Sequence, residues 1–150
     1  MIFFVIGPPR SGTTYTAKVV AESLNIPLLP EAQWIIDVYK GKRMNQYSQE
    51  NWLTYNEIKN HTSLNTKKIK NLFMNEFKAR GISCHVNNII EHTPQNCLIM
   101  NKLITLDDSK FISPLRDPKK SIYSLYTQNW FSGSLPSAAL YNFRSMLMLL

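Results

Sequence analysis

The first fourteen residues combine the pattern of a buried strand with a glycine loop, and this combination constrains the fold more than any other part of the chain. Residues 2–6 (IFFVI) are an uninterrupted run of β-branched and aromatic residues, which is typical of a strand buried on both faces. The run stops at Gly7. Residues 14–24 then carry apolar side chains at the spacing of one helical face, namely Tyr15, Val19, Val20 and Leu24. A strand, a glycine loop and a helix in this order predict an α/β unit with residues 2–6 as a central parallel strand.

Later segments continue the alternation of short strands and helices. Strands are predicted at Leu28-Leu29, Ile89-Ile90 and residues 111–115. Helices are predicted at residues 31–39, 67–80 and 95–106, from Asp117-Pro118 onward, and from about Pro136. Pro114 lacks an amide proton for a sheet ladder, so it places residues 111–115 at an edge or at a strand end. Residues 40–43 are predicted to be a loop, and residues 51–60 are ambiguous. The whole pattern predicts an α/β fold with a P-loop-type parallel sheet flanked by helices.

The composition predicts one domain over residues 1–150. Of the 150 residues 44% are hydrophobic, and only 18% are charged, which excludes disordered, collagenous and coiled-coil chains. No apolar run reaches the roughly 18 to 20 residues of a transmembrane segment. The pattern of a secretory signal is missing, so we expect a cytoplasmic protein. Residues 146–150 end in an apolar run without a helix stop, so we expect the N-terminal portion of a larger domain, incomplete at its C-terminus.

The net charge of +7 implies an anionic partner without choosing among nucleic acid, an anionic membrane surface and a phosphorylated small molecule. The basic residues are scattered and no nucleic-acid module is recognisable, so nucleic acid is the least favoured of these partners. Two cysteines, Cys84 and Cys97, do not define a disulfide framework. Together with His85 and His92 they lack the paired spacing of a rigid metal site, which favours buried free cysteine and no metal.

The loop from Gly7 to Thr14 has the sequence context of an anion-binding site. It follows a strand and opens a helix, where backbone amides and the helix dipole bind phosphate or sulfate. Its two glycines have the spacing of a Walker A loop, but Thr13 stands where that motif requires lysine, which disfavours an ordinary ATPase or kinase. Arg10 instead places a guanidinium fork inside the loop, with the hydroxyls of Thr13 and Thr14 as further donors. The alternative is a strand-to-helix turn with incidental glycines.

A second candidate anion site lies at Arg116 and Ser124. Arg116 stands where a predicted strand gives way to a helix, and Ser124 lies about two helical turns further on, so the two side chains can hold one phosphate together. On its own this pattern is weak. Arg-Asp-Pro is a common helix start, and Ser124 has an alternative interpretation as a neutral filler.

The two motifs together resemble those of the sulfotransferases that use 3′-phosphoadenosine 5′-phosphosulfate (PAPS). The resemblance is to the bacterial and tyrosylprotein-sulfotransferase-like branch, whose loop reads Pro-Arg-Ser-Gly-Thr-Thr, as residues 9–14 do here. It extends from Ile2 to about Tyr126 and implies PAPS as the sulfuryl donor, a hydroxyl or amine acceptor, and no metal. It implies that the 5′-phosphosulfate is held by Arg10, Ser11, Gly12, Thr13 and Thr14, and the 3′-phosphate by Arg116 and Ser124. The glycine-rich segment that closes over the adenine in this family is absent from the chain.

The same resemblance implies two candidates for the general base, Glu31 and His92, and a catalytic role for Arg10 at the sulfuryl group. Glu31 is similar to the acidic base of the tyrosylprotein branch, and its alternative interpretation is a carboxylate at a helix N-terminus. Residues 91–96 resemble a Glu-Lys-Thr-Pro-x-Asn segment of bacterial members, with His92 in place of lysine. A histidine is the base in the cytosolic branch, so we slightly prefer His92. Its alternative interpretation is a structural hydrogen-bonding residue.

Two other functions stay open at this stage. One is an atypical P-loop nucleotide kinase, and the other is a non-catalytic module that binds PAPS or another nucleotide. The acceptor partner also stays open among a small molecule, a glycan, a lipid and a peptide, because acceptor contacts come from variable loops. The oligomeric state is not predicted.

Overall fold

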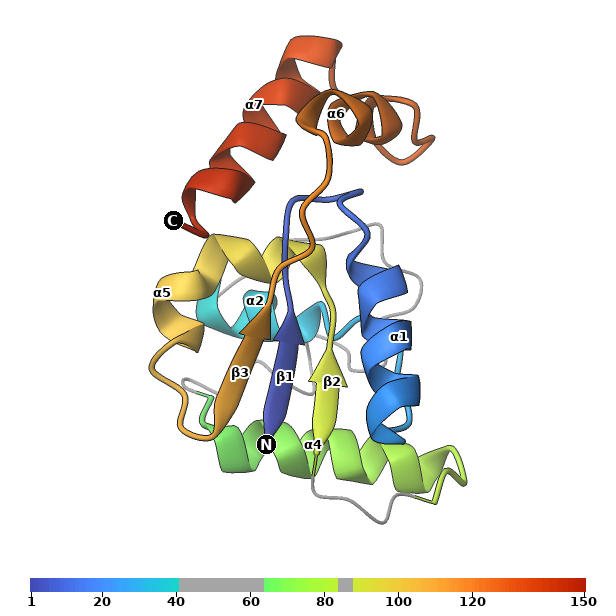
Figure 1. Cartoon of the computed structure of the whole chain (residues 1–150). Coiled ribbons are helices and arrows are strands. Elements are labelled where there is room, and N and C mark those ends of the chain that lie inside the picture. The colour runs from blue at the N-terminus through green and yellow to red at the C-terminus, as the bar shows by residue number, and fades with distance from the viewer. Residues whose placement is uncertain (41–63, 84–87) are drawn as a thin grey trace.

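The computed structural model describes residues 1–40, 64–83 and 88–150, and they form a parallel sheet between layers of helices (Figure 1). The ambiguous residues 51–60 and almost all of the predicted loop 40–43 lie outside these ranges. The sheet order is β2 (Ile89–Glu91), β1 (Ile2–Val5), β3 (Ser109–Ile112). Ile2 of β1 aligns with Ile89 on one side and with Ser109 on the other, both in parallel. The predicted α/β class and the central position of the first strand are confirmed.

The helices are α1 (Thr13–Leu24), α2 (Trp34–Lys40), α4 (Thr66–Ala79), the 3₁₀ helix η1 (Pro94–Ile99), α5 (Met100–Leu103), α6 (Pro118–Tyr126) and α7 (Leu135–Leu147). The predictions for α1, α4, α6 and α7 are correct to within a residue or two. The helix predicted at 31–39 begins three residues later. The helix predicted at 95–106 is η1 followed by one turn of α5, and the buried side chain of Asn96 ties η1 to Glu91. β3 ends at Ile112, before Pro114.

The strand predicted at Leu28-Leu29 is wrong. These residues have no regular secondary structure and lie between Pro27 and Pro30, and proline has no amide proton to donate to a sheet. Leu29 is nevertheless buried in the core. The hydrophobic pattern therefore predicted its burial correctly and its hydrogen bonding incorrectly.

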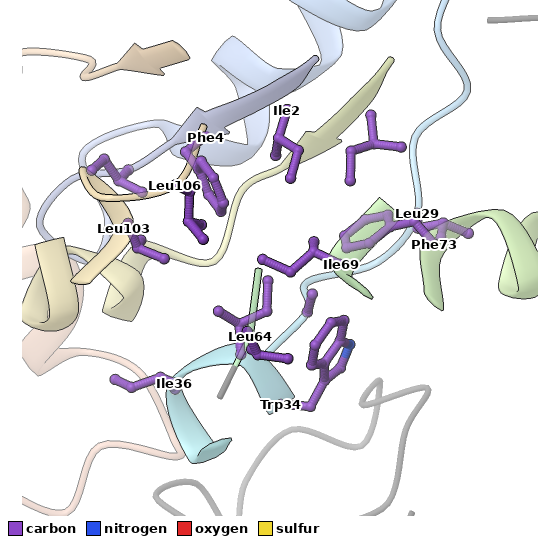
Figure 2. Packing of buried hydrophobic residues seen from close by; sticks show 14 of the residues in the cluster. Ile2, Phe4, Leu29, Trp34, Ile36, Leu64, Ile69, Phe73, Leu103 and Leu106 are labelled. Carbon is purple, nitrogen blue, oxygen red and sulfur yellow. The ribbon is translucent and has the colours of Figure 1, made fainter. Parts of the chain in front are cut away.

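The alternation of side chains along β1 divides the core into two. Ile2, Phe4 and the following Ile6 pack against α2, α4 and η1, in the larger cluster shown in Figure 2. There Phe4 stacks on Phe111 of β3 at 5.4 Å between ring centroids, and Trp34 of α2 meets Phe73 of α4 at 6.2 Å. Val5 faces the other way, towards α1. The sheet is thus covered on both faces, as a parallel sheet requires.

The face of α1 predicted from the sequence is wrong. The helix packs on the sheet through its small residues Thr13, Ala17 and Ala21, whereas Tyr15 is 75% exposed and Val19 44% exposed. The glycine loop fixes the rotation with which the chain enters α1, and the small side chains let this helix approach β1 and β2 closely. The position of the helix over the sheet, rather than the strongest apolar stripe, decides which face is buried.

The carboxyl ends of the three strands lie at one edge of the sheet. The loop after β1 and the segment after β3 both leave from this edge, and α6 and α7 lie beyond it (Figure 1). Ligands of open α/β sheets bind at such an edge. In the three described ranges no helix is long and apolar enough to cross a membrane.

Candidate active site

The loop between β1 and α1 has a backbone that presents amides to an anion. Arg10 and Gly12 have positive φ angles of 69° and 104°, and Gly12 is the N-cap of α1 without any capping side chain. The amides of the first helical turn therefore have no partner within the helix, and they point out of its positive end. A Cβ on Gly7 would lie 2.7 Å from Ser11 Oγ, so a larger residue there would displace the Ser11 hydroxyl.

The side chains of this loop divide into buried and exposed ones. Ser11 and Thr13 are buried, whereas Arg10 and Thr14 are exposed. Ser11 Oγ has no hydrogen-bond partner among the residues that the structure describes. A buried hydroxyl normally finds a partner, so this one is available to a bound ligand.

The loop and the second motif meet, although more than 100 residues separate them in the sequence. Arg116 donates from Nη1 to the backbone carbonyl of Arg10 at 2.7 Å, and Arg10 donates from Nε to Ser124 Oγ at 3.1 Å. Neither guanidinium forms an ion pair with a carboxylate within the described ranges. Two adjacent guanidinium groups without a counterion favour an anionic ligand.

Asp117 places Arg116 at the start of α6. Its side chain accepts a hydrogen bond from the amide of Lys119 at 2.8 Å and so caps the helix, while Pro118 occupies the first helical position. Ser124 then lies on α6 facing the loop. The Arg-Asp-Pro sequence is thus a helix start, which was its alternative interpretation in the sequence. It also directs Arg116 towards Arg10.

Glu91 connects the end of β2 to the segment that carries Glu31, and the sequence analysis gave it no role of its own. Its side chain is 1% exposed. Its carboxylate accepts hydrogen bonds from the amide and hydroxyl of Thr93, from the Ala32 amide at 3.3 Å and from Asn96 Nδ2 at 2.6 Å. The only sequence signal was a carboxylate followed within five residues by threonine and asparagine side chains. Glu91 is a positioning residue, because Oε1 accepts three of these bonds and Oε2 accepts the fourth, which fixes the Ala32 backbone and the start of η1 around the carboxylate.

His92 is bound to the residue two positions before Glu31. Its Nε2 donates to the backbone carbonyl of Leu29 at 3.1 Å, and the ring is almost fully buried. Since a carbonyl oxygen only accepts, Nε2 carries a proton, and Nδ1 is the nitrogen that holds the lone pair when the ring has one proton. Nδ1 is buried without a partner in the described part of the chain.

The structure places Glu31 differently from the expectation. We expected Glu31 at the carboxyl end of a second strand, but no strand lies between α1 and Glu31, and α2 begins three residues later, at Trp34. Leu29 and Ala32, on either side of Glu31, are instead tied to His92 and Glu91. These bonds bring the segments of both candidate bases to the end of β2.

Of the four residues considered as metal ligands, Cys84 and His85 lie outside the described residues. Cys97 is a buried free thiol, and burial raises its pKa to about 11. Within residues 1–40, 64–83 and 88–150 no cluster of three histidine, cysteine or acidic side chains has the arrangement of a metal site.

Comparison with known proteins agrees with this arrangement. A search of curated proteins and a search of solved structures gave no match. A protein-family model described as "Sulfotransferase family" matches residues 3–147. Because this match covers nearly the whole chain, from β1 through the glycine loop and Arg116 to α7, the protein belongs to the sulfotransferase family, whose chemistry is sulfuryl transfer.

Proposed function

We propose that the protein transfers the sulfuryl group of PAPS to a hydroxyl or amine acceptor. The observation that carries this proposal is the contact of Arg116 with the Arg10 carbonyl and of Arg10 with Ser124. It joins a loop suited to one phosphate-like group to a second arginine suited to another. A donor with a 5′-phosphosulfate and a 3′-phosphate has two such anionic ends.

The residues that would hold the donor fall into two groups. The amides of the α1 N-terminus, with Arg10, Ser11, Gly12, Thr13 and Thr14, would hold the 5′-phosphosulfate. Arg116 and Ser124 would hold the 3′-phosphate. Arg116 uses one N–H for the Arg10 carbonyl, and a guanidinium has five, so enough donors remain for a phosphate. This binding needs no metal.

The transfer step balances without any further reactant. The acceptor oxygen or nitrogen forms a bond to sulfur, while the bond from sulfur to the 5′-phosphate oxygen breaks and adenosine 3′,5′-bisphosphate leaves. Arg10 would stabilise the charge that develops on the sulfuryl and leaving oxygens. The acceptor proton would pass to His92 Nδ1, which can accept it while Nε2 keeps its bond to Leu29. Glu31 is the competing base.

Two finer assignments belong to this proposal. Residues 9–14 favour the bacterial and tyrosylprotein-sulfotransferase-like branch, and the free thiol of Cys97 agrees with a cytoplasmic location.

Ligand binding separates this proposal from the two other functions. An atypical nucleotide kinase would bind ATP with magnesium more tightly than adenosine 3′,5′-bisphosphate. A non-catalytic module would bind the bisphosphate and PAPS without turnover.

The proposal is tested by calorimetric titration with adenosine 3′,5′-bisphosphate and with AMP. We expect the bisphosphate to bind more tightly, because AMP lacks the 3′-phosphate. Replacing Arg116 with alanine removes a charged contact of about 1.5 to 3 kcal/mol, so affinity for the bisphosphate should fall about 10- to 150-fold, with little change for AMP. Arg80→Ala is the matched control, because Arg80 pairs with Glu76 on α4, at the opposite edge of the sheet. Equal affinity of the wild-type protein for both ligands would contradict the assignment of a 3′-phosphate site to Arg116 and Ser124.

The glycine loop is tested by a pair of glycine substitutions. Gly12 and Gly81 both have positive φ, and a Cβ on either has open space around it. Alanine at each should lower the free energy of unfolding by about 1 to 2 kcal/mol for conformational reasons alone. Only Gly12→Ala should also lower the affinity for adenosine 3′,5′-bisphosphate, because it changes the backbone at the entry into α1. If both variants bind like the wild type, the loop does not hold the ligand.

A further inference from the structure

A cavity of about 410 Å³ lies next to the proposed donor site. It is lined by Pro9 of the glycine loop, by residues of α2, η1 and α6, by Trp130 and Phe131 between α6 and α7, and by Tyr141 of α7. Pro9 precedes Arg10 in the chain, and the lining residues Gln33 and Gln95 follow Glu31 and His92 by two and three positions. The cavity therefore touches the glycine loop and the two segments that carry the candidate bases, although neither base is itself in its lining.

The described lining of this cavity carries no charged side chain. Aromatic and aliphatic side chains dominate it, and the rings of Trp130 and Phe131 meet edge to face at 6.3 Å. Burial raises the pKa of Tyr141 to about 12, so its hydroxyl stays neutral throughout the physiological range. A charged ligand would lose its hydration here without gaining a counterion, whereas an uncharged ring would gain apolar contact.

The side-chain amides of two glutamines in the lining are the polar groups of interest in this cavity. Oε1 of Gln33 and Oε1 of Gln95 are buried and, among the described residues, have no hydrogen-bond partner. Gln33 is only 1% exposed and both oxygen atoms lie beneath the cavity surface, so a side-chain amide has to turn towards the cavity before its oxygen can accept a hydrogen bond from a ligand. Buried acceptors without partners are rare in folded proteins, and a ligand that brings a donor would satisfy them.

We propose that this cavity binds the acceptor and that the acceptor is an uncharged aromatic alcohol. The inference rests on the proposed function for its chemistry and on the cavity lining for the class of molecule. The ring would lie among Trp130, Phe131 and Tyr141, and the hydroxyl would donate to Gln33 or Gln95 on binding. In the reaction the hydroxyl oxygen forms the bond to sulfur, its proton goes to the base, and adenosine 3′,5′-bisphosphate leaves with the electron pair of the broken S–O bond.

The test measures acceptor binding to the whole chain without any donor, by ligand-observed NMR. The probes are 2-naphthol, its methyl ether, 1-decanol and the charged 6-hydroxynaphthalene-2-sulfonate. We expect 2-naphthol to bind about five- to tenfold more tightly than the ether, which cannot donate a hydrogen bond. It should also bind better than the other two probes. Tighter binding of decanol would assign the cavity to a lipid chain, and tighter binding of the sulfonate would show an ionic site; either result overturns the proposal.

Two sets of variants locate the binding. Trp130→Ala should lower the affinity for 2-naphthol about tenfold. The control is Tyr123→Ala, which removes an exposed ring of α6 outside the cavity and should change this affinity by no more than about twofold. Replacing both Gln33 and Gln95 with leucine removes unpartnered polar groups and keeps the side-chain size, so the fold should persist while the preference for naphthol over its ether disappears. A preference that survives this double change would contradict the assignment.

The two proposals fail separately. If 2-naphthol binds as expected but adenosine 3′,5′-bisphosphate does not, the cavity is a ligand site and the donor assignment is wrong. If the bisphosphate binds and none of the uncharged probes does, the sulfotransferase proposal stands and the acceptor class is wrong.

Discussion

Turnover of the Arg10→Lys variant should fall by about 10²- to 10³-fold with saturating donor and acceptor, the loss typical of removing one well-placed donor to a developing oxyanion. Affinity for adenosine 3′,5′-bisphosphate should fall far less. Lysine keeps the positive charge but loses the planar fork, and with it the bond from Nε to Ser124 that orients the guanidinium. The charge attracts the donor in its ground state, whereas the orientation matters most when charge develops on the sulfuryl and leaving oxygens.

The measurement compares kcat with the dissociation constant of the bisphosphate. Arg80→Lys makes the same chemical change at an exposed arginine of the α4 C-terminus and should alter neither quantity. If turnover and affinity of Arg10→Lys fall by the same factor, Arg10 contributes to ground-state binding alone, and stabilisation of the transition state must be assigned to the loop amides.

The fold was predictable from the sequence where local pattern and tertiary contact agree. Residues 2–6 are apolar at every position, and only a central strand covered on both faces accommodates that. The helix of residues 67–80 was equally clear, because Ile69, Phe73 and Phe77 are both its apolar stripe and its buried face.

The predictions failed where tertiary geometry decides. Ala17 and Ala21 gave a weaker signal than Tyr15 and Val19, yet the sheet selects the small residues because α1 lies so close to it. In the same way the leucines at 28 and 29 are apolar enough for a strand, but the prolines on both sides remove the hydrogen bonds that would define one.

The candidate site was also predictable where it depends on local sequence pattern and not where it depends on tertiary contacts. Each arginine motif was visible locally, but the contact of Arg116 with the Arg10 carbonyl depends on how the chain leaves β3. The role of Glu91 and the cavity were not predictable. The bond from the Ala32 amide to Glu91 and the lining of the cavity join segments that are far apart in the sequence.

The choice between the two candidate bases leads to the other large expected effect. His92→Gln should lose about 10²- to 10⁴-fold in turnover, the usual contribution of a general base, with donor binding unchanged. Glutamine can still donate its side-chain amide to the Leu29 carbonyl, so the turn before α2 should keep its position, but it cannot accept the acceptor proton.

Glu31→Gln is the decisive comparison, because it also exchanges an ionisable group for an amide of the same shape. If His92 is the base, Glu31→Gln should retain most of its turnover. If Glu31→Gln shows the large loss and His92→Gln stays active, the base is Glu31. His92 would then act through its bond to Leu29, which holds the segment of Glu31 against the end of β2, so that removing this bond with His92→Ala should lower turnover while the His92→Gln variant restores it. The three variants together separate a histidine that takes a proton from one that positions a carboxylate.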